Sequence, residues 1–405
     1  MRLKFTFLIF FLATICFSQK NIKKPNVLLL YMDDLRPELN SYGATHIYSP
    51  NIDKLSKIGV QFNEAYANVA VCGASRASML TGIYPSRNYF VDYKTRVDVE
   101  KKEIVSLPKH LKNNGYTTIS NGKIYHFLDD NWEDWDEVWR PYAFEGPKEI
   151  KPLDWWESLW KDYQTKENKD LESLTGKGPA FEKALVEDSI LIDGLLTNKV
   201  IRDLKRLKNE SSPFFLTAGF ISNHLPFIAP KRFWDMYDYD SIKLPKNDSP
   251  PVNSPSISIS NNSELVNGYL GIPKKGDLSE DLSKKLKHGY YSTVSYVDHL
   301  VGKIIITLEE EELLENTIII FVSDHGFNLK EHSQWGKYTS HRISGRVPLI
   351  IYDPKTKSSI NSNSLVELVD IYPTVLDLLE LESPDHELEG KSLVNILKDP
   401  MFENK

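Results

Sequence analysis

The amino-acid sequence predicts an α/β protein with a large, mostly parallel central sheet flanked by helices. Two observations lead to this fold class. Short runs of apolar and β-branched residues recur along the chain, as in strands that are buried on both faces. Longer segments with helical features lie between these runs, and strands that alternate with helices favour a parallel sheet covered on both sides. Ligands of such sheets bind beyond the carboxyl ends of the strands, so the polar residues that follow each strand are candidate functional residues.

Five apolar runs are predicted to be buried strands. The first, 26–32, is followed by Asp33 and Asp34, so this strand carries two acids at its carboxyl end. The run 317–323 stops in the same way at Asp324. The other three predicted strands are 116–120, which leads to Lys123, 214–220, which leads to His224, and 347–352.

The segments between these strands, and one segment after the last of them, are predicted to be helices. They are 51–58, 107–114, 181–207, 286–314 and 365–379. The second of them is closed by Gly115, a residue that is favoured where a helix ends. The stretch 247–264 is rich in Ser, Pro and Asn, and it is predicted to be an irregular surface loop.

The composition is that of an ordinary globular protein. The chain has 405 residues, of which 26% are charged and 41% hydrophobic, and its formal net charge is -7. An acidic chain is a poor candidate for sequence-independent binding to nucleic acid. The 20 Gly and 22 Pro are too few for a collagen-like or low-complexity protein. Because the net charge is negative, any anionic ligand must be bound by locally concentrated positive charge.

The amino terminus predicts export from the cell. Arg2 and Lys4 precede an apolar run at 5–17, and this order is typical of a secretory signal peptide, here 1–18. A lipoprotein anchor at Cys16 is the alternative. No later stretch approaches about 18 uncharged apolar residues, so we expect a periplasmic or secreted protein without stable membrane insertion.

The acids at the strand ends predict a metal site. Asp33 and Asp34 follow one predicted strand and Asp324 follows another. Because the carboxyl ends of parallel strands lie at the same edge of a sheet, these side chains are expected to meet. Carboxylate oxygens suit Ca²⁺ or Mg²⁺ better than they suit a zinc site built from thiolates or several histidines.

Cys72 lies in a segment that resembles a family signature. Once 1–18 is removed, Cys72 is the one cysteine left, and such a residue is either inert and buried or a site of chemistry. The segment 71–82, V-C-G-A-S-R-A-S-M-L-T-G, closely resembles the C-x-P-S-R signature of the type I sulfatases. Further segments follow in family order at 26–34, 49–53, 122–126, 224–227, 323–326 and 331–338. The resemblance covers roughly residues 26 to 395 and is closest to the iduronate 2-sulfatase-like branch.

The resemblance implies a fold, a nucleophile and a cofactor. The implied fold is the alkaline-phosphatase-like sulfatase fold, with a small carboxyl-terminal sheet that is short or missing here. In this family a formylglycine-generating enzyme oxidises the cysteine to formylglycine, whose hydrated aldehyde is the nucleophile. The resemblance assigns that role to Cys72 and implies one calcium ion. The implied ligands are the acids at the strand ends, a histidine and the modified cysteine, namely Asp33, Asp34, Asp324, His325 and Cys72.

The resemblance also implies groups that surround the sulfate. A sulfate monoester is anionic, so catalysis needs positive groups around its oxygens and an acid for the leaving alkoxide. Arg76 lies one turn after Cys72 in a helix that is predicted to run to Thr81. Two lysines match the sulfate-contacting lysines of the family and two histidines match its proton-transferring histidines: Lys123, Lys337, His126 and His224. We expect His224 or Lys337 on the leaving-group side and His126 in hemiacetal breakdown.

The predicted function is hydrolysis of a sulfate ester on a uronic acid or similar sugar of an algal polysaccharide, such as ulvan, or of a glycosaminoglycan. A phosphatase or phosphodiesterase of the alkaline phosphatase superfamily and a non-catalytic polysaccharide-binding protein are the alternatives. The chain departs from the family at Ala74, where most members have Pro, and at Ser222 and Asn223, where Lys-Pro is common. The predicted division is a signal peptide, a catalytic domain, and either the end of that domain or a truncated carboxyl-terminal subdomain, at 1–18, 19–350 and 351–405.

Overall fold

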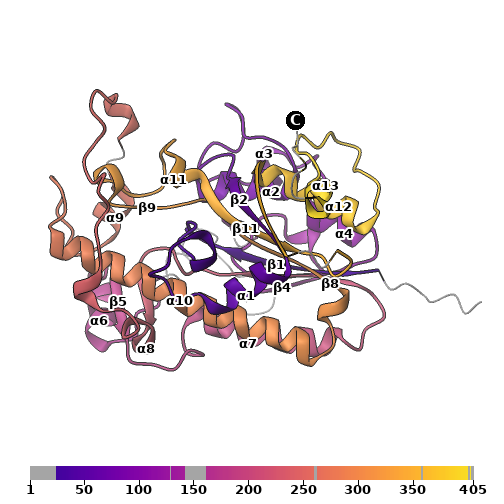
Figure 1. Ribbon diagram of the computed structural model, residues 1–405, viewed down its shortest axis with the longest axis horizontal. Coiled ribbons are helices and arrows are strands. Elements are labelled where there is room, and N and C mark those ends of the chain that lie inside the picture. Colours follow the sequence, from indigo (N-terminus) through magenta and orange to yellow (C-terminus); the bar gives the residue numbers. More distant parts are fainter. Residues whose placement is uncertain are drawn as a thin grey trace, which may run out of the picture.

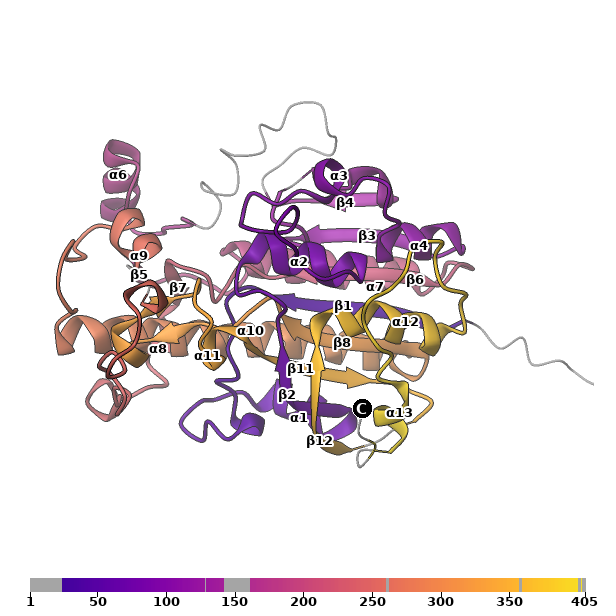
Figure 2. The ribbon, with the colours of Figure 1, turned by 90° about the horizontal axis from the view of Figure 1, so that it is seen from above.

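The computed structural model describes residues 24–127, 129–141, 161–259, 262–356, 359–399 and 402. In this part of the chain the centre is an eight-stranded sheet with the order β12-β2-β11-β8-β1-β6-β3-β4 (Figures 1 and 2). Its strands are β1 (Asn26–Met32), β2 (Val60–Tyr66), β3 (Thr117–Gly122), β4 (Glu137–Trp139), β6 (Phe214–Gly219), β8 (Thr317–Ser323), β11 (Arg346–Tyr352) and β12 (Ile360–Glu367). The predicted signal peptide, 1–18, lies outside the described residues.

Helices cover both faces of the sheet (Figure 1). One face packs against α1 (Pro50–Ile58), α7 (Ile192–Leu207) and α10 (Glu280–Glu310). The other packs against α2 (Cys72–Thr81), α4 (Leu107–Asn113), α12 (Ile371–Leu379) and α13 (Val394–Lys398). Leu28 and Leu30 of β1 join the first core and Val27 and Leu29 join the second, because successive strand residues point to opposite faces. None of the helices in the described ranges has the length and hydrophobicity that crossing a membrane requires.

The parallel strands bring their carboxyl ends to one edge of the sheet. In the described chain, β8, β1, β6, β3 and β4 are parallel neighbours. A group of smaller elements lies beyond this edge (Figure 2). It consists of the parallel pair β5 (Phe181–Ala184) and β7 (Phe227–Pro230), with α6 (Lys166–Thr175), α8 (Lys231–Trp234) and α9 (Ser263–Gly268). The remaining short elements are α3 (Val97–Glu100), α11 (Arg342–Gly345) and the antiparallel pair β9 (Asn328–Leu329) and β10 (Trp335–Gly336).

The predicted fold class is confirmed, but several predicted elements are wrong in part. The segment 181–207 does not begin as a helix, because residues 181–184 form β5 and pair with β7. The segment 365–379 begins in β12, and its helix starts only at Ile371. The strand predicted at 347–352 is present, but β11 runs antiparallel to β8 and β2. Its carboxyl end therefore lies at the opposite edge, away from the acids.

Other features were absent from the prediction. The strands β2 and β12 carry polar residues, V-Q-F-N-E-A-Y and I-N-S-N-S-L-V-E, and therefore lack a continuous apolar run. β12 pairs with β2 alone and forms an edge of the sheet, where one side of a strand need not be apolar. The predicted loop 247–264 is wrong at its end, since Ser263 and Glu264 begin α9.

Candidate active site

The two acidic strand ends meet at the carboxyl edge of the sheet. β1 and β8 are parallel neighbours, and their last residues, Met32 and Ser323, are paired in register. The residues that follow are therefore side by side, and the backbone N–H of Asp34 donates a hydrogen bond to Asp324 Oδ1 at 3.1 Å. Asp33, Asp34 and Asp324 are all buried. The structure thus brings the three acids together.

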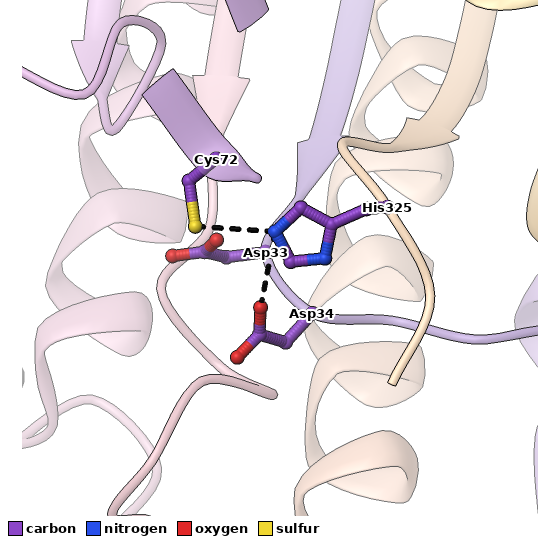
Figure 3. Close-up of side chains that lie close together, drawn as sticks. All are labelled: Asp33, Asp34, Cys72 and His325. Carbon is purple, nitrogen blue, oxygen red and sulfur yellow. Dashed lines mark hydrogen bonds and ion pairs between the residues drawn. The ribbon is translucent and has the colours of Figure 1, made fainter. Parts of the chain in front are cut away.

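Cys72 is the first residue of α2, and its side chain points toward the acids (Figure 3). Its Sγ lies 3.2 Å from His325 Nε2, and the residue is 2% exposed. Glycine is required at position 73, because a Cβ on Gly73 would lie 2.5 Å from the backbone oxygen of Tyr93. Burial raises the pKa of the Cys72 thiol well above its usual range. The unmodified sulfur is therefore protonated at neutral pH and is a poor nucleophile.

Four side chains form a group that fits a divalent cation, with ligand atoms within 4.8 Å of one another: Asp33, Asp34, Cys72 and His325. His325 Nδ1 donates to the carbonyl of Gly326 at 2.9 Å, as metal-binding histidines commonly do with their second nitrogen. Nε2 therefore faces the group, 3.5 Å from Asp34 Oδ1. Asp33 Oδ1 is buried and accepts no hydrogen bond from the described residues. A hard cation would complete this carboxylate-rich set.

Arg76 is wholly buried beside the acids, one turn after Cys72. Its Nε donates to Asp324 Oδ2 at 2.9 Å, and its Nη2 lies 3.3 Å from Asp33 Oδ1. The guanidinium also lies over the ring of Tyr31, 4.3 Å from the centroid. Arg76 therefore links an acid after β1 to an acid after β8 and holds the two in position.

The end of β3 places Lys123 in the same group. Gly122 and Gly219 end β3 and β6 and are paired, and a Cβ on Gly219 would lie 2.2 Å from the backbone oxygen of Lys123. Only glycine permits this approach. Lys123 Nζ forms an ion pair with Asp33 Oδ2, and both side chains are fully buried. Burial raises the pKa of Asp33, but Lys123 and Arg76 outweigh this effect and hold it well below its usual range.

His126 follows Lys123 by three residues and is a neutral imidazole. Its ring meets the ring of Tyr93 edge-on, with centroids 5.9 Å apart. Burial lowers the pKa of His126, and the charge of Lys123 lowers it further. Its Nδ1 makes no hydrogen bond within the described ranges. A neutral histidine of this kind can accept a proton.

A second charged group adjoins the acids. Lys337 Nζ donates to both carboxylate oxygens of Asp34 at 3.0 Å and to Glu264 Oε1 at 3.3 Å. His224 Nε2 lies 2.9 Å from the same oxygen of Glu264. The lysine and the histidine were singled out from the sequence, whereas Glu264 was not. An unexpected carboxylate therefore joins the two.

Both ring nitrogens of His224 face hydrogen-bond acceptors. Nδ1 lies 2.6 Å from the carbonyl oxygen of Leu225, and Nε2 faces the carboxylate of Glu264. Since these partners can only accept, both nitrogens donate and the ring is a cation. Burial lowers the pKa of His224 and Lys337 lowers it further, but Asp34 and Glu264 outweigh both and raise it. His224 is thus a proton donor, while His126 is neutral.

Glu264 could not be assigned to the site from its local sequence. It is the second residue of α9, and Asn262 immediately precedes that helix, a signal that can mark a helix start. Nothing local indicates what the helix faces. Glu264 and Lys337 are 73 residues apart in the chain, so their contact depends on tertiary packing alone.

Lys337 also decides how many cations the site can hold. Asp34, His224 and Glu264 offer ligand atoms within 4.8 Å of one another, which suggests a second metal position. The ammonium of Lys337 already lies there, 3.0 Å from Asp34 Oδ1 and 3.3 Å from Glu264 Oε1. The described site therefore fits one divalent ion beside a lysine and disfavours a two-metal phosphatase arrangement.

A cavity of about 570 Å³ adjoins the site. Its lining includes Tyr66, Asn68, Val71, Tyr338, His341 and Arg342. Val71 precedes Cys72 and Tyr338 follows Lys337 in the chain, so the lining includes a chain neighbour of each. Arg342 is paired with Glu64, with Nη2 2.5 Å from Oε1. The rest of the wall combines aromatic, aliphatic and polar residues.

Comparison with known proteins identifies relatives of this chain. Residues 25–381 match the family model described as Sulfatase. Iduronate 2-sulfatase from Mus musculus is 31% identical over 392 residues, which cover 89% of this chain and 69% of that protein.

Solved structures share the fold. A phosphonate monoester hydrolase from Silicibacter pomeroyi has a TM-score of 0.71 at 21% identity, covering 92% of this chain and 76% of that one. A protein in complex with its substrate, D-glucosamine-2-N,6-O-disulfate, has a TM-score of 0.68 at 22% identity, covering 93% of this chain and 81% of that one. At these identities the likeness shows the fold alone, and it confirms the predicted alkaline-phosphatase-like architecture.

Proposed function

The chain belongs to the sulfatase family, and from this premise we propose that it cleaves the sulfate ester of a sulfated sugar at Cys72. The family accounts for the reaction, which is hydrolysis of a sulfate ester. The geometry around Cys72 carries the assignment of the site. Its sulfur begins α2 and lies 3.2 Å from His325 Nε2, inside a buried group of carboxylates and cations.

Cys72 is proposed to act after conversion to formylglycine. The thiol is buried and protonated, and such a thiol is inert. A formylglycine-generating enzyme is the proposed partner, and export through the signal peptide 1–18 is part of the same proposal. Ala74 lies within the segment that this partner would read. Residues 19–350 are proposed as the catalytic domain and 351–405 as its end, because β12 pairs with β2 in the central sheet.

The proposed cofactor is one calcium ion. Its proposed ligands are Asp33, Asp34, Asp324, His325 and the modified Cys72. A bound ion would act as a Lewis acid toward the sulfate ester and the nucleophile. The carboxylate oxygens favour calcium over zinc, and Arg76 keeps Asp33 and Asp324 at a fixed spacing.

The remaining charged groups are proposed to have different roles in the reaction. Lys123 and Lys337 supply positive charge for the sulfuryl oxygens. When hydrated, a formylglycine at position 72 would supply the hydroxyl nucleophile for sulfur. Cationic His224 gives its proton to the sugar oxygen as the ester bond to sulfur breaks, and neutral His126 would accept a proton from the hydrated residue so that sulfate can be released.

The substrate is proposed to be a sulfated sugar of an algal polysaccharide or a glycosaminoglycan. Two comparisons support this class. One relative is named iduronate 2-sulfatase, and one structural neighbour was solved with D-glucosamine-2-N,6-O-disulfate as its substrate. The cavity beside Cys72, with Tyr66 and Tyr338 in its wall, offers amphipathic side chains to such a sugar.

The decisive experiment uses protein produced together with a formylglycine-generating enzyme. Mass spectrometry of the peptide that contains Cys72 is expected to show an aldehyde in place of the thiol, and 4-nitrophenyl sulfate is expected to be hydrolysed in preference to 4-nitrophenyl phosphate. Cys72→Ala is expected to keep the thermal stability and lose sulfate release. Preference for the phosphate would favour the phosphatase alternative. Polysaccharide binding without sulfate release would favour a non-catalytic protein.

A further inference from the structure

In the reaction described above, Glu264 supports His224 and Lys337 but contacts no reacting atom. Its Oε1 accepts from His224 Nε2 at 2.9 Å and from Lys337 Nζ at 3.3 Å. Its second oxygen, Oε2, is buried and accepts no hydrogen bond from any described residue. A buried carboxylate oxygen without a donor costs free energy. We therefore expect Oε2 to accept a hydrogen bond from the substrate when the substrate is bound.

The position of Glu264 is built into the fold. Asn262, just before α9, accepts a hydrogen bond from the backbone N–H of Trp335 at 2.8 Å and donates to the carbonyl of Ser333 at 3.3 Å. Leu265 is 1% exposed and belongs to the core. Trp335 precedes Lys337 by two residues. The segments that carry Glu264 and Lys337 are therefore bonded to each other.

We propose that Glu264 Oε2 accepts a hydrogen bond from a hydroxyl or amino group on the carbon next to the sulfated carbon of the substrate. This inference rests on the proposed function, in which His224 protonates the leaving oxygen. That oxygen must approach His224 Nε2, which is 2.9 Å from Glu264 Oε1. A donor one carbon away from the leaving oxygen is then within reach of the same carboxylate.

The same carboxylate determines which substrates are rejected. A carboxylate or a second sulfate on the neighbouring carbon would face Glu264 as a like charge, and like charges brought together in a buried site oppose binding. The preferred sugar therefore carries a donor beside the sulfate that is cleaved. Sugars with an acidic group at that neighbouring carbon are poor substrates.

Three simple esters test this inference: trans-2-hydroxycyclohexyl sulfate, cyclohexyl sulfate and 2-carboxycyclohexyl sulfate. For the wild-type enzyme, kcat/KM is expected to be about tenfold or more higher for the hydroxyl ester than for cyclohexyl sulfate, as for a hydrogen bond to a charged group. The carboxyl ester is expected to be the poorest of the three. In Glu264→Gln the hydroxyl preference should shrink several-fold and the carboxyl ester should gain relative to cyclohexyl sulfate. Because each enzyme is judged by the ratio of its kcat/KM values for two esters, a general effect of the substitution on His224 and Lys337 cancels.

Glu182→Gln is the matched control. Glu182 is a buried carboxylate, and it accepts from the backbone N–H groups of Gln164 and Thr165 at 2.8 and 3.0 Å, so this variant should leave both ratios unchanged. Failure to release sulfate from 4-nitrophenyl sulfate would overturn the proposed function itself. Activity on that ester, with equal or undetectable rates on the three cyclohexyl esters, would overturn the role of Glu264 alone. The wild-type ratios decide this even if Glu264→Gln fails to fold, and unchanged ratios in a folded Glu264→Gln would also overturn the role.

Discussion

Arg76 shows at the scale of one residue how the site keeps several charges out of water. Its guanidinium pairs with Asp324 and Asp33 and donates to the carbonyl of Met32 at 3.2 Å. Burial lowers the pKa of Arg76, but Asp324 and Asp33 outweigh this effect and raise it. Buried charges of this kind are tolerated only because their partners are close.

Arg76→Met should therefore be strongly destabilising. It keeps much of the length of the side chain but leaves Asp33 and Asp324 without this buried cation, so the free energy of unfolding is expected to fall by about 3–5 kcal/mol. Urea denaturation measures this loss, and sulfate release should disappear. Arg232→Met is the control, because Arg232 is 53% exposed and pairs with Asp188 at the surface, where such a pair contributes about 1 kcal/mol or less. Equal losses in the two variants would contradict the role of Arg76.

At the scale of elements, ion pairs fasten the segment that carries Lys337 to the end of β1. Arg36 lies shortly after β1 and pairs with Glu38 at 2.7 Å and with Glu331 at 2.9 Å. Glu331 lies between β9 and β10, and its Oε2 accepts from the backbone N–H of Leu329 at 2.6 Å. The strand pair that leads to Lys337 is thus held beside the acids that follow β1.

Removal of the charge of Glu38, which pairs with Arg36, should have a defined pH dependence. Burial raises the pKa of Glu38, but Arg36 and His46 outweigh this effect and lower it to about 2. The unfolded chain therefore binds the proton more readily, so the stabilisation is fully present above the ordinary value of 4.5 and is lost as the pH falls toward 2. Glu38→Gln should lower the free energy of unfolding by about 1–3 kcal/mol near pH 7. Denaturant titrations over this pH range should show the difference from wild type shrinking, and a constant difference would argue against the ion pair as its source.

At the scale of the whole molecule, the site joins three elements that are distant in sequence. Asp33 and Asp34 follow β1, Asp324 and His325 follow β8, and Cys72 begins α2. A cation bound by all five residues would cross-link the sheet to the helix layer on one of its faces. Binding to the native state alone stabilises a protein by mass action.

Calcium should therefore raise the thermal stability of chelator-treated protein. A free calcium concentration about 100 times the dissociation constant corresponds to about 2.7 kcal/mol, and differential scanning calorimetry would register it as a higher Tm. Asp324→Asn should lose most of the response. Stabilisation by zinc but not by calcium would contradict the proposed metal.

The sequence predicted much of the parallel core and of the candidate site. The bounds of β1 and β8 agree with the prediction, because each is a continuous apolar run that ends in acids. The helix that starts at Cys72 is also present. β2 and β12 were not predicted, because their sequences mix polar and apolar residues and their pairing depends on neighbours that are remote in the chain.

By itself, the sequence determined the family, the residues at the strand ends and the position of Cys72, because these depend on local order along the chain. Only the tertiary structure decided that Glu264 bridges His224 and Lys337, that Arg76 lies buried between two acids, and that β11 is antiparallel. The physical reason is that the hydrophobic pattern of a segment indicates which of its residues are buried. The partner of a buried charge depends instead on how segments that are distant in sequence pack together.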